Sequence, residues 1–166
     1  FEPLIADIVA RLLDRIEDLG ELDMIDDFAK ELPTEIISFM LGIPEEFRPN
    51  LRRFSLAILG ALDPVVSAER LAAGHAAVTE VSQILNDLIN HRRAHPESAG
   101  QGEVLDSLIF GEVDGRALTQ EELIQNCIFL LNAGHETTTS LVGNSVATLL
   151  DNPDQHRDLL DNPDII

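Results

Sequence analysis

The sequence lacks tryptophan and tyrosine altogether, and its 166 residues include a single cysteine, Cys127. Seven phenylalanines are the only aromatic residues, which argues against aromatic platforms for stacking bases or sugars. One cysteine excludes an internal disulfide framework and a multi-thiolate zinc site. It leaves open one reactive thiol or one metal thiolate.

Basic residues are also scarce. Eleven Lys and Arg stand against thirty Asp and Glu, so the formal net charge is 11 − 30 = −19. Such an excess of negative charge argues against a nucleic-acid backbone or an anionic membrane surface as partner. The 45% of hydrophobic residues is nevertheless sufficient for a core, so the acidity does not indicate disorder.

Long apolar runs are missing as well. The longest near the centre covers residues 127–131, far short of the ~20 residues that a membrane-spanning helix needs. The first 14 residues have neither the basic region nor the uninterrupted apolar region of a signal peptide. These absences predict a cytoplasmic chain without a membrane partner.

What the sequence does contain is a helical pattern of apolar residues in nearly every segment, and no stretch alternates as a strand would. The predicted class is therefore all-α. The pattern predicts a turn at residues 113–116 between two very short strands, a polar loop at residues 97–102, and helices at residues 4–19, 33–41, 45–62, 67–95, 104–110, 120–150 and 153–160.

The helix predicted at residues 120–150 is the most informative element. Thr119 and Glu122 have the spacing of a capping box, and no proline interrupts the pattern before Asn152 and Pro153. At 1.5 Å per residue this helix is roughly 46 Å long, enough to cross a whole domain. Apolar residues surround both of its ends almost completely, which predicts burial at the centre of the protein.

The middle of this helix conflicts with that burial, because residues 132–140 read NAGHETTTS. Gly134 costs about 1 kcal/mol relative to alanine in a helix, and a buried Glu136 needs a partner or a shifted pKa. Conflicts between local preference and global burial tend to mark functional sites.

Three residues of the helix share one face, because Phe129, Ala133 and Thr137 are spaced four apart. Ala133 and Gly134 leave room for a flat ligand or another backbone, and threonine can bond its hydroxyl to a carbonyl one turn back. An acid beside a hydroxyl, with water admitted, is a plausible proton relay.

Two other interpretations of this segment stay open. His135 and Glu136 begin like the H-E-x-x-H motif of zinc proteases, but Thr139 stands where the second histidine belongs. Alternatively, the small residues form only a tight helix crossing. A separate pair, His91 and His95, has metal-compatible spacing, although positive charge at a helix C-terminus explains it as well.

Residues 133–138, AGHETT, resemble the central-helix signature of the cytochromes P450, [A/G]-G-x-[D/E]-T-[T/S]. The flanking segments are similar to soluble bacterial members in the same order, at residues 32–37, 41–46, 62–64, 91–96, 118–123 and 152–155. The resemblance covers the whole chain but only the middle of the family's chain, from the helix named D to the long I helix and the start of J. It implies that residues 1–166 are one partial P450 domain built around the I helix, without the N-terminal sheet and the haem-thiolate loop.

The resemblance also implies roles for individual residues. Glu136 would deliver protons through water, and Thr137 would hydrogen-bond dioxygen. The haem would lie against Ala133, Gly134, Thr137 and Thr138, while Phe129 and Asn132 would face the substrate. No metal ligand is expected, since Cys127 does not match the haem loop and is a core residue by this interpretation.

The activity implied is that of a haem-thiolate monooxygenase, which hydroxylates a small, mainly apolar organic substrate with dioxygen and electrons from a ferredoxin- or reductase-type partner. The region of Phe47, Phe54 and Leu59 would add apolar lining to the pocket. The isolated chain is expected to be inactive, to bind haem poorly or not at all, and to self-associate. The alternative is a non-enzymatic, acidic helical bundle whose threonine-rich helix is a packing surface for an interaction module.

Overall fold

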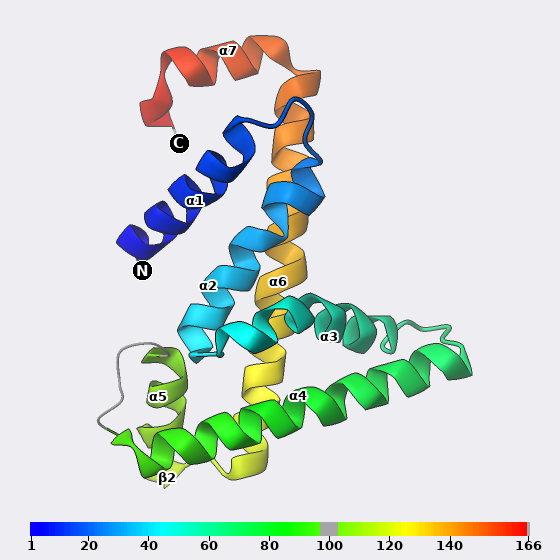
Figure 1. Ribbon diagram of the computed structural model, residues 1–166, viewed down its shortest axis with the longest axis vertical. Helices are drawn as coiled ribbons and strands as arrows, with labels where there is room; N and C mark the ends of the chain where they lie inside the picture. Colours follow the sequence, from blue (N-terminus) through cyan, green and yellow to red (C-terminus); the bar gives the residue numbers. More distant parts are fainter. Residues whose placement is uncertain (97–102, 166) are drawn as a thin grey trace.

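The computed structural model describes residues 1–96 and 103–165, and most of them are helical. A 32-residue helix, α6 (Gln120–Asp151), forms the axis of the molecule, and the other elements are arranged along it (Figure 1). These elements are α1 (Glu2–Glu17), η1 (Met24–Ala29), α2 (Glu31–Leu41), η2 (Glu45–Phe47), α3 (Arg48–Gly60), α4 (Ala68–Ala94), α5 (Glu103–Phe110), β1 (Glu112–Val113), β2 (Arg116–Ala117), α7 (Pro153–Asp161) and η4 (Pro163–Ile165). The predicted all-α class is confirmed.

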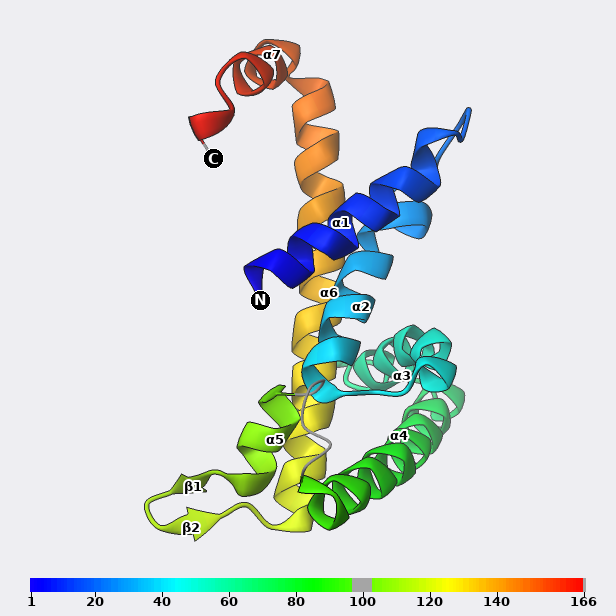
Figure 2. The same cartoon turned by 60° about the vertical axis from the view of Figure 1, so that its left-hand side comes forward.

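The elements divide between the two halves of α6. Helix α1 and η1 lie beside its C-terminal half, α2 runs along its middle, and α3, α4, α5 and the β1–β2 hairpin surround its N-terminal half (Figure 2). The two strands pair antiparallel, with Glu112 opposite Ala117. None of the described helices is long and apolar enough to cross a membrane.

The start of α6 is fixed by the predicted capping box. The Glu122 backbone N–H donates to Thr119 Oγ1 at 3.2 Å, and the Thr119 N–H donates to the Glu122 carboxylate at 2.8 Å. Arg116 also donates twice to that carboxylate, at 2.9 Å each. The guanidinium of Arg116 and the Thr119 donors lower the pKa of Glu122 to about 2. Together these contacts tie the hairpin to the first turn of the helix.

The main core forms where one stripe of α6 meets α2, α3, α4 and α5. Leu123, Cys127 and Leu131 follow one another at every fourth position of α6 and are fully buried. They pack with side chains such as Leu51 and Phe54 of α3 and with further residues from α4 and α5. A smaller cluster joins Ile8 and Leu12 of α1 to Phe28 of η1, with Val142 of α6 packed against it.

The prediction that α6 is buried all round is wrong for this chain. Outside the buried stripe, the side chains of Phe129, Leu141 and Leu150 are 67%, 67% and 68% exposed. The helix is covered on the side of α2, α3 and α4, and its other sides carry apolar groups that these helices do not reach.

Several boundaries also differ from the predicted ones. The segment predicted as one helix at residues 45–62 is divided into η2 and α3, with Pro49 in the first turn of α3. Helix α1 ends at Glu17, two residues before the predicted end at residue 19. The π-helical turn η1 was not predicted; it begins at Asp23, whose side chain accepts from the N–H groups of Ile25 and Asp26. The loop predicted at residues 97–102 lies outside the described residues.

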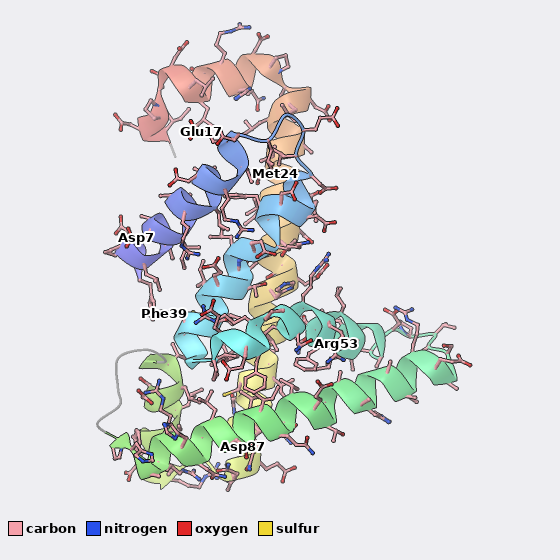
Figure 3. All side chains as sticks on the ribbon, viewed as in Figure 1. Asp7, Glu17, Met24, Phe39, Arg53 and Asp87 are labelled. Atoms are coloured by element: carbon pink, nitrogen blue, oxygen red, sulfur yellow. The ribbon has the colours of Figure 1, made fainter. Side chains whose placement is uncertain are left out.

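Helices α3 and α4 cross each other closely. Arg53, labelled on α3 in Figure 3, pairs with Glu80 of α4 at 2.8 Å. A Cβ atom placed on Gly74 of α4 would lie 2.3 Å from the Cβ of Ala61 and 3.1 Å from the carbonyl oxygen of Ala57. Glycine at this position therefore sets the distance between the two helices.

We expect Gly74→Ala to lower the free energy of unfolding by about 2 kcal/mol. Overpacking against backbone costs about 3 kcal/mol at its upper range and exceeds the ~1 kcal/mol that alanine gains in helix propensity. Urea denaturation measures the difference. Gly143→Ala is the matched control, since its Cβ would meet only the tip of the Ile25 side chain, which can rotate. An equal loss in both variants would contradict this account of the α3–α4 crossing.

Candidate functional site

The middle of α6 is uninterrupted helix in spite of its glycine and threonines. Thr137 Oγ1 donates to the carbonyl oxygen of Ala133 at 2.5 Å, and Thr139 Oγ1 donates to that of His135 at 2.9 Å. The predicted bonding of threonine hydroxyls one turn back is thus confirmed. Thr137 itself is exposed, so its hydroxyl lies at the surface of the helix.

An apolar groove of about 620 Å³ runs beside this segment, between α6 and α3, with Val78 contributed by α4. Ile58, Leu59 and Leu62 line it from the side of α3. From α6 it is lined by Gln125, Ile128, Phe129, Asn132, Ala133, Glu136 and Thr137. Both predicted catalytic residues and both predicted substrate-facing residues therefore meet at one groove.

A second, smaller hollow of about 360 Å³ lies on the other side of Ala133, between α6 and α2. Gly134 and Thr138, the remaining predicted cofactor contacts, line this hollow and not the groove. A Cβ atom on Gly134 would lie 3.0 Å from Cδ1 of Ile37, so the glycine admits a close approach of α2. Ala133 borders both hollows.

Asn132 is held by α3 rather than free to turn toward a ligand. Ser55 Oγ, fully buried, donates to Asn132 Oδ1 at 3.0 Å, and Asn132 Nδ2 donates to the carbonyl oxygen of Ile128 at 2.8 Å. The bond between Ser55 and Asn132 links α3 to α6 one turn before Glu136. Sequence reasoning missed Ser55, although a serine among the apolar positions of α3 was a signal.

The apolar region predicted around Phe47, Phe54 and Leu59 is only partly correct. Leu59 does line the groove. Phe54 is fully buried in the main core, and Phe47 lines a different hollow, beside α4.

His135, which the sequence suggested only as the start of an incomplete zinc motif, is a further functional candidate. Its side chain is 0% exposed, and neither ring nitrogen has a hydrogen-bond partner. Nδ1 lies 4.0 Å from Oε2 of Glu136, whose side chain is 45% exposed. Burial lowers the pKa of His135 below its ordinary value of 6.5; Glu136 raises it in part, and Arg52 lowers it further. The ring is therefore neutral at pH 7.

This shift predicts a pH dependence of stability. Because the pKa is lower in the folded chain, the unfolded chain binds the proton at a higher pH. The stability that the neutral ring provides is complete above 6.5 and is lost as the pH falls from there toward the folded pKa. Between about pH 7.5 and about pH 5.5, we expect the free energy of unfolding to fall more in the wild type than in His135→Leu. Urea denaturation at both pH values tests this. An equal change in the free energy of unfolding in the two proteins would refute it.

Cys127 belongs to the buried stripe of α6. Burial raises the pKa of its thiol to about 11, so the thiolate is disfavoured. Ala133 follows six residues later and lies about 120° around the helix from it. The thiol thus points into the main core, away from the face that carries Ala133 and Thr137.

The histidines do not form a metal centre. Within residues 1–96 and 103–165, no group of three or more His, Cys, Asp or Glu side chains is arranged to hold a metal ion. His91 and His95 stack with their ring centroids 4.5 Å apart, and the other candidate, His135, is enclosed in the core.

Fold and groove together define a class: an all-α chain whose longest helix presents an acid and a hydroxyl to an apolar groove. The sequence pattern of one family, described as Cytochrome P450, matches residues 6–162. The chain therefore belongs to the cytochrome P450 family, as its sequence predicted.

Similar proteins support this membership. The chain is 34% identical over 166 residues to a protein named Biotin biosynthesis cytochrome P450 from Bacillus subtilis, covering 100% of this chain and 41% of that one. It is also 34% identical to Vitamin D(3) 25-hydroxylase from Pseudonocardia autotrophica, covering 99% and 38%. The crystal structure of P450BioI in complex with an acyl carrier protein ligated to hexadec-9Z-enoic acid superposes with a TM-score of 0.88 at 34% identity, covering 98% of this chain and 40% of that one.

The chain thus spans about two fifths of the length of the relatives it matches. Within that span, the matching fold confirms a helical part of the P450 fold with α6 as its long central helix. Family membership favours an enzyme over the alternative of an interaction module.

Proposed function

We propose that this chain is the part of a P450 monooxygenase that binds an organic substrate and delivers protons for the activation of dioxygen. The observation that carries the proposal is the meeting of Glu136 and Thr137 at one apolar groove. Relatives named as a 25-hydroxylase and as Nocardicin C N-oxygenase are consistent with it.

The residues of α6 fit a haem. Ala133 and Thr137 form a small, exposed surface, and Ala133 separates two mainly apolar hollows, which leaves room for a flat apolar group. Ala133, Gly134, Thr137 and Thr138 are the residues that would hold it. When bound, the haem supplies the binding and reduction of dioxygen. Its thiolate ligand would come from outside this chain, since Cys127 lies around the helix in the core.

The side chains of the groove have separate tasks. Phe129, Ile58 and Leu62 exclude water and bind apolar substrate atoms. Glu136, half-exposed at the groove, takes up a proton from solvent on its carboxylate and passes it on through water. The Thr137 hydroxyl can exchange its bond to the Ala133 carbonyl for a bond to dioxygen or water, and thereby direct that proton.

The groove also supports a proposal about the class of substrate. Its volume of about 620 Å³ is in the usual range of small-molecule sites, and its lining is nearly all apolar, so we propose a small, mainly apolar organic substrate. Leu62, at the start of the connection between α3 and α4, lines the groove, and we propose that this connection serves as a lid. Electrons would come from a ferredoxin- or reductase-type partner.

Residues 1–166 would then be one partial domain that is inactive alone and needs the remaining haem-binding segments. The reading frame around the chain tests the proposal. We expect an E-x-x-R segment and a cysteine-bearing F-x-x-G-x-x-x-C loop downstream. A complete reading frame without that cysteine would overturn the monooxygenase function.

A further inference from the structure

His135 occupies a position where an apolar residue would be expected. It follows Leu131 and precedes Thr139 on the buried stripe of α6, and its burial is complete within this chain. Its neighbours on α6 contact two other helices, since Asn132 bonds to Ser55 of α3 and Gly134 faces Ile37 of α2. Ala133 and Thr137 are exposed, whereas this chain alone encloses the side chain of His135 completely.

Two unpartnered ring nitrogens in the core are costly. A buried polar group without a hydrogen bond destabilises the fold, and a leucine in the same place would avoid this cost. A further interaction of the ring would explain why a histidine stands here.

Two charged groups act on the ring. Oε2 of Glu136, on the same helix, lies 4.0 Å from Nδ1, and Arg52 acts from α3. Arg52 is itself drawn toward η1 by Asp26, at 3.6 Å. Glu136 forms no hydrogen bond within the described residues, and its half-exposed side chain can rotate. A hydrogen bond to Nδ1 requires Oε2 to move about 1 Å closer than its present 4.0 Å, because such bonds span about 3 Å.

We propose that His135 is a positioning residue for Glu136, with its neutral ring donating the Nδ1 hydrogen to Oε2 of the carboxylate. Held by one oxygen from inside the core, the carboxylate presents its other oxygen, Oε1, to the groove and to Thr137. The proton that Glu136 passes on then leaves from a fixed position. This inference rests on the proposed function of Glu136, but the contact can be tested without it.

The first test follows the His135 ring by NMR in the ¹⁵N-labelled 166-residue chain, with its signals assigned by their loss in His135→Asn. We expect the Nδ1–H tautomer. Glu136→Gln should lower the titration midpoint of His135 by about 0.5 pH unit or more, and Arg52→Gln should raise it. Glu121→Gln, which removes the same charge from the first turn of α6, should leave it unchanged. An Nε2–H tautomer would overturn the contact. A titration midpoint of His135 that is unchanged in Glu136→Gln would overturn it as well.

The second test uses the full-length, haem-loaded protein. His135→Leu should reduce kcat about tenfold and shift its pH profile, with an unchanged KM because His135 does not line the groove. His135→Asn, whose amide can donate from nearly the same position, should restore most of kcat. Equal losses in both variants would overturn the positioning role. Failure of the full-length protein to bind haem would refute the proposed function instead, and the NMR result would still decide the contact.

Discussion

Replacing Glu136 with glutamine in the full-length, haem-loaded protein is expected to slow substrate oxidation by about 100-fold or more. Glutamine has the same shape and can still accept from Nδ1 of His135, but it has no proton to transfer. Proton transfer by a positioned acid contributes roughly 10²–10⁴-fold to a reaction rate. The measurement is product formed per unit time at saturating substrate.

Glu121→Gln is the control for this loss. It removes a carboxylate from the exposed first turn of the same helix, where Glu121 accepts a hydrogen bond from Gln125 at 3.2 Å but does not itself line the groove. Its rate should match the wild type. If Glu136→Gln oxidises substrate as fast as Glu121→Gln, then Glu136 delivers no proton that limits the reaction.

The second large effect concerns the isolated chain, which we expect to self-associate at about 10 μM. Large apolar side chains project from the uncovered sides of α6, among them Phe129, Leu141 and Leu150. Monomeric proteins rarely leave apolar patches of more than a few hundred Å² open to water. Light scattering should therefore report species larger than a monomer.

Serine substitutions identify the surface responsible. The double variant Phe129→Ser, Leu141→Ser should move the distribution toward monomer. Leu19→Ser, on the exposed connection between α1 and η1, should not. A monodisperse monomer in the unsubstituted chain would contradict the prediction.

The sequence predicted the long helix well because its limits are local. The Thr119 capping box and the Asn152–Pro153 break involve only neighbouring residues, and the structure has the helix at Gln120–Asp151. The π-helical turn η1 was missed, since its packing against Gly143 of α6 joins segments more than 100 residues apart. A periodicity of 3.6 residues carries no information about such a contact.

The groove was predictable for a related reason. Phe129, Ala133 and Thr137 lie on one helix face, so their spacing alone brings them together. The opposite wall of the groove and the burial of His135 depend on how α3 and α2 cross α6. These crossings follow from packing between distant segments, such as the contact of Gly134 with Ile37.

The central claim is that this chain supplies the oxygen-activating helix of a haem-thiolate enzyme. It is tested most directly by the absorption spectrum of the full-length protein after reduction and addition of carbon monoxide. We predict an absorption band at about 450 nm, the wavelength that the family's name records. We predict no such band for the 166-residue chain alone. A full-length protein that takes up no haem, or that lacks this band, would contradict the claim.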